Sequence, residues 1–317
     1  MRLLVRRAKR PHDRGMPGEG MTDQGGGPEA QRDARRGVPA PTGADTSPTT
    51  TSTHRHDRPG VVPVNDPFRQ LRVKMWRMNG TPDIHSLLAP GRTLRPERAG
   101  IVSVLPVGEQ GAPYDRRAAT YDRLVTNRVY NRLAWGTDPA DYDLFAGEAV
   151  AAGVGPFLDV GCGSAAFTAA AYQGVSRPLV LVDRSLEMLG RASERLAGEP
   201  AALVQADLLD LPFTAGRFAA VACFGVLHVL DEPWAALRAL RDQLAPGGHM
   251  FVSMLVADRG IGRAYLTALH RTGEVGPPRR AQELADAARA VFGATCEVRR
   301  TGSMAWLRAA VSGPSPR

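Results

Sequence analysis

The chain has 317 residues, of which 43% are hydrophobic, so its length allows about two domains and a sizeable core. Its formal net charge of +8 is unevenly placed, because residues 1–110 hold 18 Lys and Arg against 11 Asp and Glu, whereas the remainder is nearly neutral. No stretch of about 18 apolar residues occurs, which excludes a membrane-spanning helix, and the nearly neutral remainder argues against a nucleic-acid partner.

Residues 1–110 are predicted to be a disordered basic extension or the product of a wrongly assigned start, since Met75 or Met78 could begin a sensible protein. The glycine run at 25–27 and the Thr, Ser and Pro tract at 46–53 cannot bury enough apolar surface to offset the entropy of ordering. A basic arm that contacts nucleic acid or anionic lipid through charge is the alternative. The basic start is followed by no apolar run of a signal peptide, so secretion is not predicted.

Residues 111–312 alternate helical and strand signals, which predicts a folded domain with amino-terminal cap helices within 114–152. Strands separated by helices of this length are typical of βαβ units and a parallel sheet. The last two strands are joined around Gly302 and should form an antiparallel hairpin. The expected strands are 156–160, 179–182, 202–205, 219–223, 249–255, 295–300 and 304–311, and the expected helices are 118–135, 141–152, 165–172, 186–196, 233–244, 261–270 and 281–292.

These elements predict an α/β fold with a Rossmann-like, doubly wound, mainly parallel sheet of seven strands and an antiparallel edge hairpin at its C-terminal end. In such sheets, ligands bind outside the carboxyl ends of the strands, near the point where the strand order reverses. The candidate site is therefore sought where strands end.

A glycine turn follows the first predicted strand of this domain. Asp159 stands two positions before Gly161, and Gly163 follows after Cys162. Glycines let a backbone adopt positive φ and pass close to a ligand, while the carboxylate favours a cation over a pyrophosphate. The turn therefore suits an adenosyl cofactor that carries an ammonium group.

The same turn satisfies a dinucleotide-binding pattern if Ala166 takes the place of the third glycine. A NAD(P)-dependent Rossmann oxidoreductase is therefore the first alternative. Its pyrophosphate would lie at a helix amino terminus, where Asp159 would repel it. A cofactor-binding protein without turnover is the second alternative.

Two further carboxylates follow the next two strands. Asp183 comes 20 positions after Gly163, the spacing at which an acid can accept hydrogen bonds from ribose hydroxyls, although Asp183 or Ser185 could instead cap a helix. Asp207 can accept the amino group of an adenine, although an ordinary surface turn would also place it there.

The motifs together resemble the class I S-adenosylmethionine-dependent methyltransferases, and within them the type 11 group, over about residues 114–311. The segments that carry the resemblance are 158–163, 180–183 with Ser185 and 188–189, 206–208 with 211–213, 224–230 and 244–248. The family resemblance implies that S-adenosylmethionine is the cofactor. It also implies that a methyl group passes by in-line displacement to a small organic acceptor.

The resemblance implies roles for individual residues. Asp159 would hold the methionine ammonium, Gly161 and Gly163 would let the turn pass under the methionine, and Asp183 would bind ribose. The other implied cofactor contacts are Arg184 beside the adenine, Asp207 and Leu208 at its amino edge and ring face, Phe224 through its backbone, and Cys162 within the turn as a space-filling residue. Tyr121 resembles the tyrosine of the amino-terminal helices that close over the cofactor, but it could equally be a core residue.

Ala165 departs from the family pattern, because many members have a third glycine at this position. Its methyl group is expected to be tolerated, since the residue is predicted to lie inside a helix, where alanine is the better former.

Methyl transfer needs mainly placement of the acceptor in line with the departing sulfur. A base is needed only if the acceptor loses a proton, and His228 is the candidate because it follows the fourth predicted strand and its unperturbed pKa is near 6.5. A packed or capping histidine is the alternative. The insert at 256–280 is expected to cap the acceptor pocket. No metal ligands are predicted, and three widely spaced cysteines predict a reducing, cytoplasmic setting.

Overall fold

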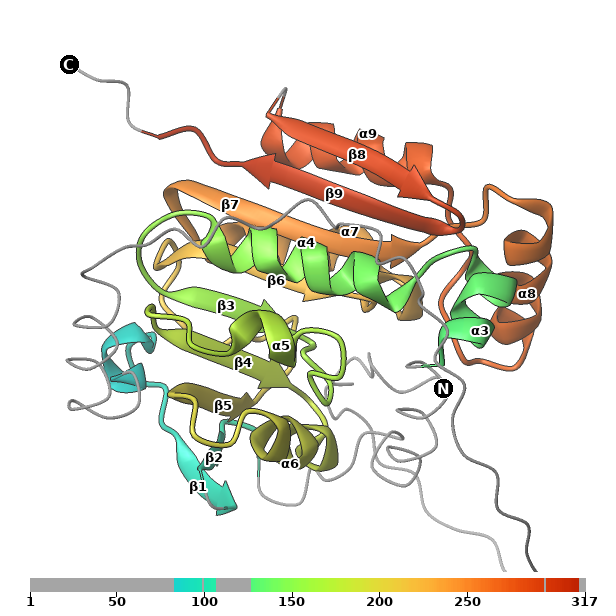
Figure 1. The fold of residues 1–317 in the computed structure, drawn as a ribbon. Helices are drawn as coiled ribbons and strands as arrows, with labels where there is room; N and C mark the ends of the chain where they lie inside the picture. The colour runs from blue at the N-terminus through green and yellow to red at the C-terminus, as the bar shows by residue number, and fades with distance from the viewer. Residues whose placement is uncertain (1–82, 99, 107–126, 294, 314–317) are drawn as a thin grey trace, which may run out of the picture. The chain divides into compact units, whose positions relative to one another are not determined.

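The computed structural model describes residues 83–98, 100–106, 127–293 and 295–313. A sheet of nine strands runs through this part of the chain, with helices on both of its faces (Figure 1). The strands are β1 (Arg95–Arg98), β2 (Ile101–Ser103), β3 (Phe157–Val160), β4 (Leu179–Asp183), β5 (Ala201–Gln205), β6 (Phe218–Phe224), β7 (Leu244–Leu255), β8 (Cys296–Thr301) and β9 (Met304–Ala310).

The described residues form α-helices, two short 3-10 turns and one π-helical turn. The α-helices are α3 (Arg128–Tyr130), α4 (Pro139–Ala151), α5 (Ala169–Tyr172), α6 (Leu186–Arg195), α7 (Pro233–Asp242), α8 (Gly260–Arg271) and α9 (Ala281–Phe292). The 3-10 turns are η1 (Ile84–Leu87) and η3 (Leu227–Val229), and η2 (Asn131–Trp135) is a π-helical turn. None of these helices has the length and apolar character needed to cross a membrane.

The strand order β1-β2-β5-β4-β3-β6-β7-β9-β8 places the reversal point between β3 and β6. The chain moves outward from β3 through β4 to β5 and then returns to β6, which pairs with β3 in parallel. Strand β9 pairs antiparallel with both β7 and β8, so the predicted edge hairpin is confirmed. The doubly wound order brings the carboxyl ends of β3 and β6 side by side, where such sheets bind ligands.

Alternate residues of the central strands fill two separate cores. On β4, Leu179 and Leu181 belong to one apolar cluster, while Val180 and Val182 belong to the other. Side chains on a strand alternate between the two faces of its sheet. The first cluster includes Phe145 of α4, and the second includes Leu237 of α7. The continuously apolar strands are therefore explained by helices that cover both faces.

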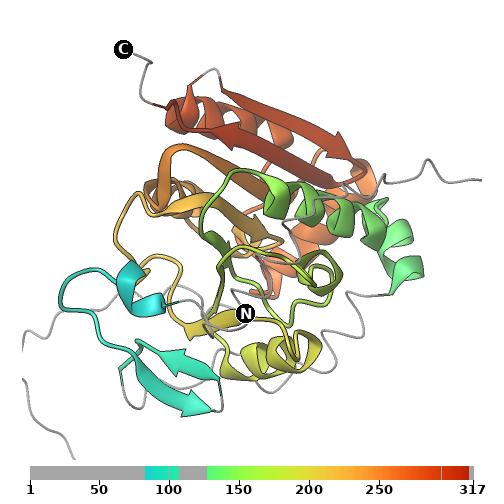
Figure 2. The same cartoon turned by 60° about the vertical axis from the view of Figure 1, so that its left-hand side comes forward.

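The sheet has two more strands than the sequence predicts. Residues 83–106 were assigned to an extension outside the folded domain, but β2 pairs in parallel with β5 and β1 pairs antiparallel with β2. Figure 2 shows β1 and β2 at the opposite edge of the sheet from β8 and β9. Strand β1 is largely exposed and contains Pro96, and β2 has three residues, so neither carries a clear apolar alternation. A four-residue polar edge strand and a three-residue inner strand are too short to show a clear period-2 pattern in the sequence.

Two predicted helices differ from the structure. The helix predicted over 165–172 begins only at Ala169, and Ala165 has a φ of +54°, so the expectation that Ala165 is helical is wrong. Residues 118–126 of the helix predicted over 118–135 lie outside the described residues, and 128–135 form α3 and then η2.

Arg177 fixes the connection between α4 and β3. Its guanidinium donates to the carbonyl oxygens of Val150, Ala152, Gly155 and Pro156 at 2.6–3.2 Å. Burial lowers the pKa of Arg177 to about 10. One side chain therefore satisfies the carbonyl groups at the end of α4 and orients the strand that leads into the glycine turn.

Replacing Arg177 by Met should lower the free energy of unfolding by about 2–4 kcal/mol, because several carbonyl groups lose a charged donor. Urea unfolding followed by circular dichroism measures this loss. Arg289→Met is the matched control, since Arg289 pairs with Asp286 on the exposed face of α9, and it should change stability by less than about 1 kcal/mol. Equal losses in the two variants would contradict the role given to Arg177.

Candidate active site

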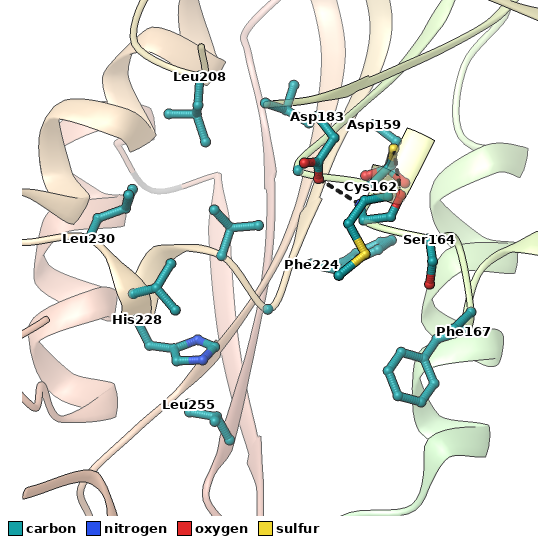
Figure 3. A pocket seen from close by; sticks show the side chains of 18 of the residues that line it. Asp159, Cys162, Ser164, Phe167, Asp183, Leu208, Phe224, His228, Leu230 and Leu255 are labelled. Atoms are coloured by element: carbon teal, nitrogen blue, oxygen red, sulfur yellow. Dashed lines mark hydrogen bonds between the residues drawn. The ribbon is translucent and has the colours of Figure 1, made fainter. Parts of the chain in front are cut away.

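A cavity of about 310 Å³ lies at the carboxyl ends of β3, β4, β5 and β6. Every sequence-predicted site residue within the described part of the chain lines it. These residues are Asp159, Gly161, Cys162, Gly163, Asp183, Arg184, Asp207, Leu208, Phe224 and His228. Tyr121 lies outside the described residues. Figure 3 shows Asp159 and Asp183 toward one end of the cavity and His228, Phe167 and Leu255 toward the other.

The glycine turn needs its glycines for two different reasons. Gly161 has a φ of +74°, and a Cβ at this position would lie 2.4 Å from Cγ2 of Val226. Gly163 has a φ of +55°, but a Cβ there would meet no atom within 4 Å. Gly161 therefore permits close packing against the segment after β6, whereas Gly163 keeps space open at the cavity.

Ala165 shares the left-handed conformation of these glycines. Its φ of +54° is the one positive value at a non-glycine residue in the described part of the chain, and its side chain is 1% exposed. A left-handed alanine costs about 1–2 kcal/mol. Relative to glycine, burial of the methyl group stabilises the folded state by about 0.8 kcal/mol. The smaller conformational entropy of alanine in the unfolded chain adds about 0.4–1 kcal/mol. These magnitudes nearly cancel, which explains how alanine occupies the position.

Ala165→Gly should therefore change the free energy of unfolding by less than about 1 kcal/mol. Ala165→Val should lower it by about 3 kcal/mol, because a β-branched side chain is strained at this φ and crowds a filled core. Urea unfolding of both variants gives the two values. If Ala165→Val were as stable as the wild type, the left-handed conformation of residue 165 would be wrong.

The Asp159 carboxylate is buried with one oxygen engaged and the other unpartnered. Its side chain is 1% exposed, and Oδ2 accepts a hydrogen bond of 2.9 Å from the hydroxyl of Tyr172. No hydrogen-bond partner for Oδ1 lies among the described residues. Burial, with a smaller contribution from the charge of Asp183, raises the pKa of Asp159 to about 7 against the effect of the Tyr172 bond. Such a carboxylate is suited to receive a cationic donor.

Asp183 closes the glycine turn onto the end of β4. Its Oδ2 accepts a hydrogen bond of 2.8 Å from the Gly163 amide, and its Oδ1 accepts one of 2.8 Å from the Ser185 amide. Ser185 in turn caps α6 by accepting from the amide of Met188. The helix cap that the sequence offers as an alternative to ribose binding is thus present, and Ser185 provides it. Asp183 positions the turn, and its carboxylate also lines the cavity.

Arg184 and Asp207 form an ion pair between the ends of β4 and β5. The family resemblance implies a separate contact to an adenine for each of them, and their pairing is not predicted by the sequence. Oδ1 of Asp207 also accepts a hydrogen bond of 2.9 Å from the amide of Leu209, and the Arg184 carbonyl accepts one of 3.0 Å from Gln205. The pair lines the cavity together with Leu208.

His228 lies on η3, directly after β6, and Figure 3 shows its imidazole pointing into the cavity. Its Nδ1 is buried without a hydrogen-bond partner among the described residues. Burial lowers the pKa of His228 to about 4, so the ring is neutral at pH 7. The backbone carbonyl of His228 accepts a hydrogen bond of 3.0 Å from Gly276, which fixes η3 against the loop after α8.

A group of aromatic side chains that no sequence motif predicts lies around the same end of the cavity. We call this group the aromatic wall, and it consists of Tyr130, Trp135, Tyr142, Phe167 and Tyr265. Trp135 stacks on Tyr265 with ring centroids 4.9 Å apart, and Tyr142 stacks on Phe167 at 4.8 Å. The wall draws on α3, η2 and α4, on the segment between the glycine turn and α5, and on α8, whose Tyr265 lies 135 positions after Tyr130, so no local motif could have revealed it.

Comparison with known proteins identifies the central part of this domain. Residues 158–252 match the family model of a methyltransferase domain. An uncharacterised protein of Synechococcus is 36% identical over 121 residues, which are 36% of this chain and 29% of that protein. An uncharacterised methyltransferase of Mycobacterium bovis is 30% identical over 115 residues, which are 36% of this chain and 58% of that protein. The chain thus matches less than two thirds of the length of either relative.

A solved structure shows the same fold. An O-methyltransferase family protein from Burkholderia thailandensis superposes with a TM-score of 0.51 at 16% identity, over 63% of this chain and 61% of that chain. At this identity the likeness concerns the fold, and the family match rests on residues 158–252. Residues 158–252 are therefore similar to the methyltransferase domain family, and the sheet around them has the fold of a solved O-methyltransferase family protein, in agreement with the S-adenosylmethionine cofactor that the sequence predicts.

Proposed function

We propose that this protein transfers a methyl group from S-adenosylmethionine to a small organic acceptor. The observation that carries the proposal is the cavity at the reversal point of the sheet, where the glycine turn and three carboxylates meet. When bound, S-adenosylmethionine supplies an activated methyl group on a sulfonium. The protein then contributes placement of the two reactants and exclusion of water.

The residues present fit the cofactor at its charged end. Oδ1 of Asp159 is a buried acceptor without a partner among the described residues, and the methionine portion of the cofactor offers an ammonium donor. The open space at Gly163 lets a ligand pass close to the backbone. Asp183, Asp207 and Leu208 lie farther along the same cavity and would meet the ribose and adenine. Arg184 would lie beside the adenine, held by its ion pair with Asp207.

The start of α5 argues against the dinucleotide alternative. A pyrophosphate site needs a helix amino terminus directly after the glycine turn. Here α5 begins at Ala169 and has four residues, so the turn at Gly163 does not lead straight into a helix. The buried carboxylate of Asp159 would also face the phosphate charges.

Calorimetry with S-adenosylhomocysteine and with NADH tests the cofactor proposal directly. S-adenosylhomocysteine should bind and NADH should not, whereas binding of NADH alone would overturn the proposal. Incubation of the protein with a labelled methyl donor and a metabolite extract should transfer label to a small molecule. Cofactor binding without any labelled product would instead support a protein that binds the cofactor without turnover.

Binding of S-adenosylhomocysteine should tighten by about tenfold per pH unit between pH 5 and pH 6.5 and then level off near pH 7. The pKa of Asp159 is about 7, so below this pH its carboxyl group must lose a proton before it can pair with an ammonium. Calorimetry in two buffers of different ionisation enthalpy measures both the affinity and the proton released. Asp159→Asn should abolish this pH dependence. A flat profile in the wild type would show that Asp159 does not pair with the ligand.

We propose the cytoplasm as the setting and a small molecule, not a nucleic acid, as the acceptor. The three cysteines of the chain are free, which is typical of a reducing compartment. The residues expected to cap the acceptor pocket at 256–280 include Tyr265, Leu269 and Val275, which line the cavity.

A further inference from the structure

The half of the cavity away from Asp159 is apolar and aromatic. It is formed by the aromatic wall together with Leu255, Leu269, Val275 and Met304. The tyrosine hydroxyls of the wall are engaged inside the protein, since Tyr130 and Tyr265 share a hydrogen bond of 3.1 Å and Tyr142 donates to Sδ of Met304 at 3.7 Å. The wall therefore offers ring faces to a ligand, which favours a flat apolar molecule.

The charged side chains of the cavity disfavour an anionic acceptor. Among the described residues that line the cavity, Arg184 is the one cationic side chain, and it is ion-paired with Asp207 at the cofactor end. The acidic side chain toward the acceptor end is Glu274. An anion placed against the aromatic wall would lose its hydration without gaining an opposite charge.

His228 supplies a polar atom at this apolar end. Its imidazole points into the cavity, and no described residue holds its Nδ1 in a hydrogen bond. The backbone that carries the ring packs closely against the loop after α8, because Gly276 donates to the His228 carbonyl and a Cβ at Gly276 would lie 2.1 Å from the Leu230 carbonyl oxygen. Burial lowers the pKa of His228 to about 4, so a neutral ring with one lone pair is present at pH 7. Surroundings that disfavour an imidazolium also disfavour a cationic acceptor beside it.

We propose that the acceptor is an uncharged molecule with a flat aromatic ring and a hydroxyl group, whose ring packs on the aromatic wall and whose hydroxyl donates to the imidazole of His228. This inference rests on the proposed methyl transfer. The acceptor oxygen forms a bond to the methyl carbon as the bond from that carbon to sulfur breaks, and the bonding electron pair stays on sulfur. The hydroxyl proton leaves along its hydrogen bond to His228, which relays a proton to water without remaining charged, so the products are a neutral methyl ether and a neutral thioether.

Four probes with one ring system test the acceptor class on the full chain, in the presence of saturating S-adenosylhomocysteine. They are 1-naphthol, naphthalene, 1-naphthoate and 1-naphthylmethylamine in its ammonium form. Naphthol should bind about tenfold more tightly than naphthalene, which is the value of one hydrogen bond. It should also bind at least about tenfold more tightly than either charged probe. A charged probe that binds as tightly as naphthol, or no binding by any of the four, would overturn the inference.

Two variants isolate the contribution of His228. His228→Phe keeps a ring but removes both nitrogens, so naphthol should fall to the affinity of naphthalene while naphthalene itself is unaffected. Methyl ether formation from labelled S-adenosylmethionine and naphthol should fall by at least about 100-fold in this variant. His249→Phe is the control, because His249 lies at the other end of the parallel strands and does not line the cavity.

The outcomes separate this inference from the proposed function. If S-adenosylhomocysteine fails to bind the wild type, the methyl-transfer proposal itself fails. If it binds but naphthol is not methylated, or is methylated equally by His228→Phe, then the role of His228 as proton acceptor is wrong. The comparison of the four probes on the wild type does not depend on how well a variant folds.

Discussion

Asp159→Asn should weaken the binding of S-adenosylhomocysteine by at least about 30-fold, which corresponds to about 2 kcal/mol, because an ammonium would lose a buried charged partner. The carboxylate is 1% exposed, and its Oδ1 has no partner among the described residues. The neutral amide of asparagine keeps the shape of the side chain and removes its charge. Isothermal titration calorimetry at pH 8, where the wild-type carboxylate is ionised, measures the change.

The same variant should not lower the thermal unfolding midpoint at pH 8. Burial raises the pKa of Asp159 to about 7, so above that pH the folded protein carries a buried charge that opposes folding. Removing the charge removes this cost, so weaker binding and retained stability should occur together. Asp286→Asn on the exposed face of α9 is the control and should change neither value. If Asp159→Asn bound S-adenosylhomocysteine within about threefold of the wild-type affinity, Asp159 would not be a cofactor contact.

Gly161→Ala should lower the free energy of unfolding by about 2–4 kcal/mol, through left-handed strain and overpacking. The φ of Gly161 is +74°, and the added Cβ would lie 2.4 Å from Cγ2 of Val226. Val226 is β-branched and adjusts its χ1 poorly. Urea unfolding measures the loss. The double variant Gly161→Ala with Val226→Ala should recover part of it, because the steric overlap is relieved while the strain in φ persists.

Gly163→Ala should separate binding from folding. Its added Cβ meets no protein atom within 4 Å, so the stability cost should be about 1–2 kcal/mol from φ alone. At the cavity wall the same methyl group should lower the affinity for S-adenosylhomocysteine by at least about tenfold, because a ligand passes close to the backbone there. Gly198→Ala is the matched control, with a φ of +86° and open space around it. It should show a similar cost in stability and no change in affinity. Unchanged affinity in Gly163→Ala would mean that the ligand does not pass the turn.

The parallel sheet and the cofactor end of the cavity follow from local signals in the sequence. Apolar runs such as 179–182 show the strands, and Asp159, Asp183 and Asp207 lie at or just after the carboxyl ends of successive strands, which meet at one edge. The positive φ of Gly161 and Gly163 is also a local property, because it depends on the absence of a Cβ. These features needed no knowledge of distant contacts.

Other parts of the domain could not be predicted in this way. The left-handed φ of Ala165 and the late start of α5 at Ala169 contradict the helix propensity of an alanine-rich segment. The hydrogen bond from Tyr172 to Asp159 depends on how α5 packs against β3. Strand β2 is too short and too mixed in character to be recognised without its partner β5.

The sequence by itself determined the fold class, the glycine turn and the carboxylates that point to an adenosyl cofactor, because each depends on residues that are neighbours along the chain. Only the tertiary structure decided what surrounds the acceptor. Tyr130 and Tyr265 are 135 positions apart yet share a hydrogen bond, and Arg184 after β4 is paired with Asp207 after β5. Such contacts arise when packing brings separate elements together, and the environment of His228 depends on them in the same way.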